Sequence, residues 1–92
     1  MKELLERTRK MIKDGETDEA IVLLENITKS EKVFSEEVYY QLGNAYRKQG
    51  NWQGALNNYQ EAININPDSP AKDARQMIMD ILNFYNKDMF NQ

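Results

Sequence analysis

The chain contains no cysteine and no histidine, and these two absences exclude much of the chemistry that small proteins use. Without cysteine there are no disulfides and no thiolate metal ligands, and without histidine the commonest general base is missing. No apolar run approaches the length of a membrane span. The opening stretch, MKELLERTRKMIK, interrupts its apolar residues with charges, unlike a secretory signal. We therefore expect a soluble, cytoplasmic protein without a membrane partner or a cofactor.

The chain also has no large excess of positive or negative charge. Twelve basic and fifteen acidic residues give a formal net charge of −3, which is too mild to indicate a nucleic-acid partner. The hydrophobic fraction of 40% and the charged fraction of 29% are typical of a globular protein. A chain of 92 residues supports one small domain, which buries only about 60% of the surface that its unfolded form exposes.

Candidate catalytic residues are few. The serines include Ser35 and Ser69, whose positions are suited to helix capping. Glu36 and Glu37 are adjacent, so we expect their side chains to diverge around a helix instead of meeting at a substrate. The glycines occur singly, so there is no glycine-rich phosphate loop. The sequence therefore predicts neither an enzyme nor a metal site.

Helical periodicity dominates the whole sequence, and there is no strand signal. Gly15 and Gly50 predict left-handed stops after a first and a third helix, and Pro67 ends a fourth helix expected over 52–65. A fifth helix is expected to run through at least Tyr85. The residues expected to cap or begin helices are Thr17, Ser35, Asn51, Ser69 and Pro70.

The sequence contains an internal repeat of one helix pair. Gly15 and Gly50 are 35 residues apart, and Ala20 and Ala55 keep the same offset. Periods of 20 to 50 residues indicate a stacked repeat, in which each unit buries its apolar face against the next. The second copy is the clearer one. Its motif is Tyr39-x-x-Leu42-Gly43-x-x-Tyr46, followed by Ala55-x-x-x-Tyr59, Ala62 and Pro67.

This motif resembles the signature of the tetratricopeptide repeat (TPR) family, with tyrosine in its tryptophan and phenylalanine positions. The resemblance covers residues 36–69 fully and residues 1–35 more weakly. It implies an all-α, right-handed superhelix of two helical hairpins, with residues 70–90 as a capping helix. It also implies a non-enzymatic module that binds other proteins.

A glycine in the middle of the third helix requires an explanation. Gly43 costs about 1 kcal/mol relative to alanine in a helix interior. We expect the missing side chain to let the fourth helix approach closely, opposite the small residues Ala55 and Ala62. In the first copy Arg7 and Thr8 occupy the positions of the Leu-Gly pair, so its helices are expected to pack less closely.

In the TPR family, the face of each first helix that points away from its partner helix lines a concave surface for extended peptides. Here that face carries several cations around one tyrosine, which would suit an acidic segment or a C-terminal carboxylate of a protein partner. The simpler alternative is a set of solvated cations on an exposed face. The predicted peptide-binding residues are Lys2, Arg9, Lys13, Tyr40, Asn44, Arg47, Lys48 and Arg75.

The fifth helix is more apolar than one packing stripe requires. One interpretation buries Met77, Ile81 and Phe84 against the fourth helix. The other makes the helix a self-association surface, so that the protein is a structural subunit, because two repeats are fewer than a stable array usually needs. The residues expected at such a weak homodimer interface are Ile78, Leu82, Tyr85 and Met89.

Overall fold

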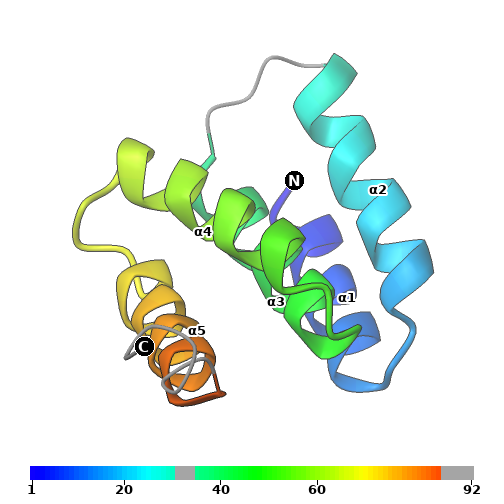
Figure 1. Ribbon diagram of the computed structural model, residues 1–92. Helices are drawn as coiled ribbons and strands as arrows, with labels where there is room; N and C mark the ends of the chain where they lie inside the picture. The colour runs from blue at the N-terminus through cyan, green and yellow to red at the C-terminus, as the bar shows by residue number, and fades with distance from the viewer. Residues whose placement is uncertain (31–34, 86–92) are drawn as a thin grey trace.

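The computed structural model describes residues 1–30 and 35–85, and these residues form five α-helices (Figure 1). The described residues contain no strand, which confirms the prediction of an all-α fold. None of the helices in these two ranges is long and apolar enough to cross a bilayer. The helices are α1 (Lys2–Lys13), α2 (Thr17–Ser30), α3 (Glu36–Lys48), α4 (Trp52–Ile65) and α5 (Ala71–Tyr85).

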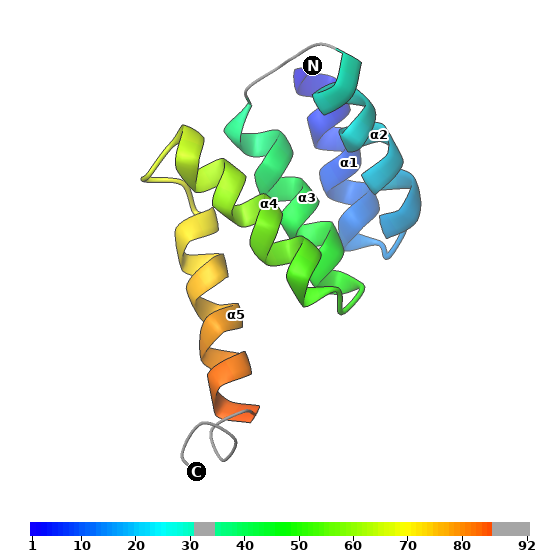
Figure 2. The same cartoon turned by 45° about the horizontal axis from the view of Figure 1, so that its top comes forward.

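The helices are arranged as two antiparallel hairpins followed by one further helix. Figure 2 shows α1 beside α2, and α3 beside α4, with α5 continuing from the end of α4. The first hairpin contacts the second mainly through α2 and α3, while α5 packs on α4. The helices α1, α3 and α5 run in one direction, and α2 and α4 run in the opposite direction (Figure 2).

The same turn closes the first helix of each hairpin. Gly15 and Gly50 have φ angles of 91° and 77°, the left-handed conformation that glycine adopts without penalty. The N–H of Gly15 donates to the carbonyl of Ile12 (3.1 Å), and the N–H of Glu16 donates to that of Met11 (2.8 Å). The equivalent two bonds after Gly50 are both 2.9 Å. This pair of bonds is a Schellman motif, and both predicted glycine stops are confirmed.

The predicted caps differ in what their side chains do. The Oδ1 atom of Asn51 accepts from the N–H of Gly54 (2.9 Å), and Ser69 Oγ accepts from the N–H of Ala71 (3.1 Å). Both satisfy orphan donors in the first turn of a helix. Ser35 occupies the N-cap position of α3 as expected, but its side chain makes no capping hydrogen bond.

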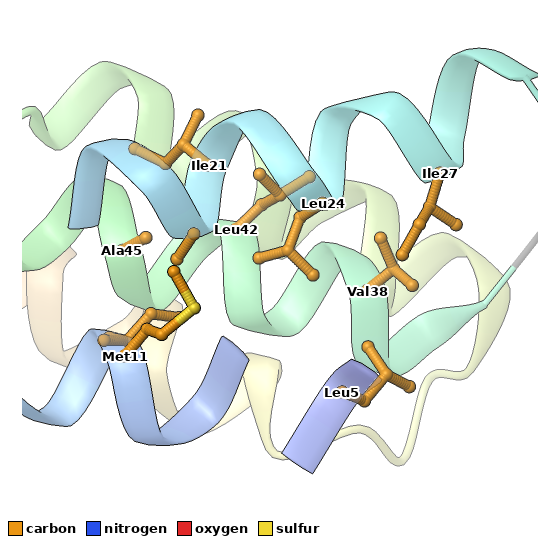
Figure 3. Packing of buried hydrophobic residues seen from close by; sticks show 10 residues of the cluster. Leu5, Met11, Ile21, Leu24, Ile27, Val38, Leu42 and Ala45 are labelled. Carbon is orange, nitrogen blue, oxygen red and sulfur yellow. The ribbon is translucent and has the colours of Figure 1, made fainter. Parts of the chain in front are cut away.

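Two clusters of buried residues hold the helices together. In Figure 3, Leu24 and Ile27 of α2 point toward Val38 and Leu42 of α3. Leu5 and other α1 residues complete this first cluster, which joins the two hairpins. The second cluster joins the second hairpin to the last helix, and its buried residues are Ala55, Tyr59, Ala62, Ala71, Ala74 and Ile78.

The glycine in α3 makes room for an aromatic ring. A Cβ atom placed on Gly43 would overlap Cδ1 and Cε1 of Tyr59 and would lie 3.0 Å from its Cγ. The close approach predicted at this glycine is therefore made by the ring of Tyr59, which is fully buried. Ala55 and Ala62 are also fully buried, but they are not the atoms nearest to this site.

The packing of α5 corrects one sequence-based interpretation. Met77, Ile81 and Phe84 were expected to be buried against α4, but their exposed fractions are 57%, 40% and 75%. The helix instead turns Ala71 and Ala74 toward α4. Small side chains at these two positions let the helices approach closely. This close packing stabilises the observed orientation more than burial of Met77, Ile81 and Phe84 would stabilise the alternative one.

The same rotation affects the predicted homodimer surface. Ile78 is only 1% exposed, because it lies in the second core cluster, so it cannot contact another molecule without unfolding. Leu82 is half-buried against that cluster. Met89 and the side chain of Tyr85 lie outside the described part of the structure. The predicted interface is therefore wrong at Ile78, and any apolar contact surface on α5 must use other residues.

Candidate functional site

A surface cavity of about 450 Å³ lies where α1, α3 and the start of α5 meet. It contains three of the predicted peptide-binding residues, Arg9, Tyr40 and Asn44. Most of its other lining residues were not predicted from the sequence. The full set of lining residues is Arg9, Ile12, Glu36, Glu37, Tyr40, Gln41, Asn44 and Pro70.

The main cation of this cavity is already paired. The guanidinium of Arg9 donates to Glu37 Oε2 at 2.6 Å, and both side chains remain partly exposed. Glu36 also lines the cavity and accepts a hydrogen bond from Asn66 Nδ2 (3.1 Å). Glu36 and Glu37 both line the cavity, but they turn to different partners, Glu37 to Arg9 of α1 and Glu36 to Asn66 at the end of α4. The cavity therefore contains charges of both signs.

A buried polar network fixes the base of the cavity. Gln41 Nε2 donates to the carbonyl of Leu5 (2.9 Å) and to Glu37 Oε2 (2.9 Å). Thr8 Oγ1 lies 2.5 Å from Gln41 Oε1 and donates to it. Because Thr8 and Gln41 are buried, these bonds link α1 rigidly to α3 and hold the Arg9–Glu37 pair in place.

One signal in the sequence could have revealed this network. Gln41 falls on the stripe of α3 that also carries Val38 and Ala45, at spacings of three and four. A polar residue on an otherwise apolar stripe requires a buried partner, since an unpaired amide in the core is costly. Thr8, in the position of the second copy's glycine, is that partner.

Tyr40, which lines the cavity, packs on the buried ring of Tyr59 from α4. The ring centroids of Tyr40 and Tyr59 are 6.1 Å apart, with the planes tilted by 40°. The hydroxyl of Tyr59 donates to Asn44 Oδ1 at 2.5 Å. Burial raises the pKa of Tyr59 to about 12, although the charge of Arg47 opposes the shift. Tyr59 therefore stays protonated at neutral pH and orients Asn44.

The other predicted cations, Lys2, Lys13, Arg47, Lys48 and Arg75, are not among the lining residues of this cavity. Lys48 Nζ donates to the carbonyl of Lys13 (2.9 Å), which joins the C-terminal ends of α3 and α1. Lys2 and Lys13 line two shallower hollows, and each of these also contains Arg9. Arg75 is half-buried on α5 and is not among the lining residues of the cavity.

The described residues do not form a metal site. Within 1–30 and 35–85, no group of three or more acidic side chains is placed to hold a metal ion. The acidic residues of the cavity make hydrogen bonds to arginine, glutamine and asparagine side chains. The arrangement is therefore suited to binding polar and charged groups.

The second hairpin matches a known family. The family model for the tetratricopeptide repeat matches residues 36–69, the range that carries the tyrosine, glycine and alanine motif. The second hairpin is a TPR repeat. TPR repeats generally mediate protein–protein interactions and are not catalytic, so the cavity between α1, α3 and α5 lies in a module of that general kind.

Comparison with solved structures extends the likeness beyond the second repeat. The solution NMR structure of the Bacteroides fragilis protein BF1650 is 57% identical to this TPR protein. The match covers 96% of this chain and 89% of that one, with a TM-score of 0.83. No curated protein matches the sequence significantly.

Proposed function

We propose that this TPR protein binds an extended segment of a partner protein in the cavity between α1, α3 and α5. The observation that carries the proposal is the convergence of Arg9, Tyr40 and Asn44 on one cavity. Together they offer a cation, an aromatic face and an amide, which are the groups that fix a peptide backbone and one acidic side chain. The function is that of a non-enzymatic adaptor.

The proposed partner segment is acidic or ends in a free carboxylate. Lys13, Arg47 and Lys48 occupy the C-terminal ends of α1 and α3, and Asn44, one turn before Lys48, lines the cavity. Asn44 uses its oxygen to accept from Tyr59, so its amide N–H groups are the part that can donate to a ligand. Donors and cations on one side of the cavity favour a carboxylate there.

A pull-down from native cytosol tests this function. Arg47→Glu combined with Lys48→Glu should abolish capture of the partner, because two attractive charges become repulsive. The matched control makes the same change at Lys29 and Lys72, exposed residues of α2 and α5. Capture that survives the Arg47/Lys48 reversal, or that the control also abolishes, contradicts binding at this groove.

A structural subunit that self-associates through α5 is the second candidate. It is favoured by the exposure of Met77, Ile81 and Phe84, which follow one another at helical spacing. Sedimentation equilibrium separates the two candidates. A monomer at high micromolar concentration contradicts self-association, whereas a dimer that Met77→Ser and Ile81→Ser dissociate supports it.

A further inference from the structure

α5 repeats the burial pattern of α3. Val38, Gln41, Leu42 and Ala45 are buried on the side of α3 that meets the preceding hairpin. The residue 33 positions after Leu42, Arg75, is only half-buried, but the residues 33 positions after the other three are buried against the second hairpin. They are Ala71, Ala74 and Ile78.

The start of α5 borders the cavity itself, because Pro70, the residue before Ala71, is one of its lining residues. The residues that correspond to Leu42 and Gly43 are Arg75 and Gln76, which are polar. Gly43 receives the ring of Tyr59 from the partner helix α4, so the polar, exposed Gln76 at its position indicates that this side of α5 does not receive a helix in the same way.

The same offset identifies the residues of α5 that continue the groove face. Met77 and Ile81 stand in the positions of Asn44 and Lys48, and both are substantially exposed. Tyr40, which lines the cavity, also packs against the cluster that contains the buried face of α5. The remaining two positions, those of Tyr40 and Arg47, are occupied on α5 by Asp73 and Asp80.

The groove face therefore changes from basic on α3 to apolar and acidic on α5. On α3 the C-terminal end carries the cations Arg47 and Lys48, whereas on α5 the apolar pair alternates with two carboxylates, Asp73 and Asp80. Asp80 accepts a hydrogen bond from Gln76 Nε2 (2.9 Å), which holds its charge beside that pair. An acidic ligand residue is attracted over α3 and repelled over α5, where an apolar residue gains by leaving water.

We infer that the groove extends onto α5 and selects a segment with a carboxylate over α1 and α3 and apolar side chains over α5. This inference rests on the proposed function, because it assigns the ligand class of the same groove. Two exposed side chains supply only part of the roughly 800 Å² that a stable interface buries on each partner, so the apolar pair fits a peptide better than a second copy. It is large enough to accept one or two ligand side chains.

Fluorescence anisotropy with short labelled peptides tests the inference. One probe has aspartates at one end and leucines at the other, and a second has serine in place of leucine. Met77→Ser with Ile81→Ser should weaken binding of the leucine probe by about tenfold and leave the serine probe unchanged. Val22→Ser, at another exposed apolar residue, is the control and should change neither.

The outcomes separate this inference from the proposed function. Equal affinity of the two probes, or no effect of the Met77/Ile81 change, overturns the inference. The proposed function survives that result if Arg47→Glu with Lys48→Glu still weakens both probes. If the charge reversal affects neither probe, both proposals are wrong. If Met77→Ser and Ile81→Ser instead dissociate a dimer without changing peptide affinity, a second copy occupies the face and the inference is overturned.

Discussion

The ring of Tyr59 lies over Gly43, so an aromatic side chain of α4 occupies the space that a side chain of α3 would fill. The relationship is reciprocal, because a Cβ atom on Gly54 of α4 would lie 2.9 Å from Cγ of Tyr46 on α3. α3 and α4 thus each supply one tyrosine and one glycine, and the glycine of each helix makes room for the tyrosine of the other helix. The two rings fix the angle and the separation of the helices.

Substitution of Gly43 should show how tightly this contact is packed. Gly43→Ala should destabilise the protein by about 1–3 kcal/mol, although alanine favours the helix by about 1 kcal/mol. The reason is that the added methyl group overlaps a buried ring that is hydrogen-bonded to Asn44 and cannot move freely. Gly43→Leu should cost considerably more. Urea denaturation measures both, and equal effects of alanine and leucine would contradict the account.

A double-mutant cycle provides the control for this contact. The first hairpin has Leu24 at the position of Tyr59. In a Tyr59→Leu background, Gly43→Ala should therefore lose most of its cost, because the smaller side chain leaves room for a methyl group. A cost that stays the same in both backgrounds would show that the glycine is required for a reason other than the ring.

Removal of the buried amide at Gln41 should destabilise the junction between the hairpins. Gln41→Ala removes the two hydrogen bonds that join Gln41 to α1, each worth about 0.5–1.5 kcal/mol, while Thr8 keeps its bond to the carbonyl of Leu5 (3.0 Å). Gln53→Ala is the matched control, because Gln53 is exposed and bonds only to Asn57 on its own helix face. Similar midpoints for the two variants in urea would argue against a structural role for the network.

The helices were predictable because their ends depend on local chemistry. Gly15 and Gly50 stop helices through their own backbone angles, and Asn51 caps the next helix through its own side chain. The offset between α3 and α5 was harder to predict. Met77 and Ala74 are both plausible buried residues on one helix, and only the space beside α4 decides between them.

The candidate site was predictable in part for a similar reason. Helical spacing alone puts Tyr40 and Asn44 on one face, and they line the cavity together. It does not reveal that Arg9 reaches across to Glu37 on another helix, because that pairing depends on how α1 and α3 are held by Gln41. Long-range pairs of flexible side chains leave no periodic signal in a sequence.

The pairing of Arg9 predicts that Glu37 competes with an acidic ligand. Glu37→Gln should strengthen binding of an aspartate-rich peptide several-fold, because the guanidinium of Arg9 then lacks its carboxylate partner. Glu36→Gln removes the same charge from the same cavity, but among the described residues Glu36 is bonded to Asn66 and not to a cation. Fluorescence anisotropy should therefore show a smaller gain for Glu36→Gln, and equal gains would mean that only net charge matters.

Alkaline pH should weaken the fold through Tyr59. Burial raises its pKa from 10.0 to about 12, so between these values the unfolded chain loses the proton while the folded protein retains it. The stability that Tyr59 contributes is therefore fully present below pH 10 and declines as the pH rises toward 12. Thermal unfolding across this range should show the decline.

Tyr59→Phe is the variant that isolates this effect. It should be less stable at neutral pH, because Asn44 loses its hydrogen-bond donor, but its stability should fall less steeply above pH 10. Some slope should remain, because burial, the hydrogen bond to Glu25 and the negative charge of Glu25 also raise the pKa of Tyr46. If wild type and Tyr59→Phe lose stability in parallel above pH 10, the phenol of Tyr59 is not the group that stays protonated, and its assigned burial over Gly43 is wrong.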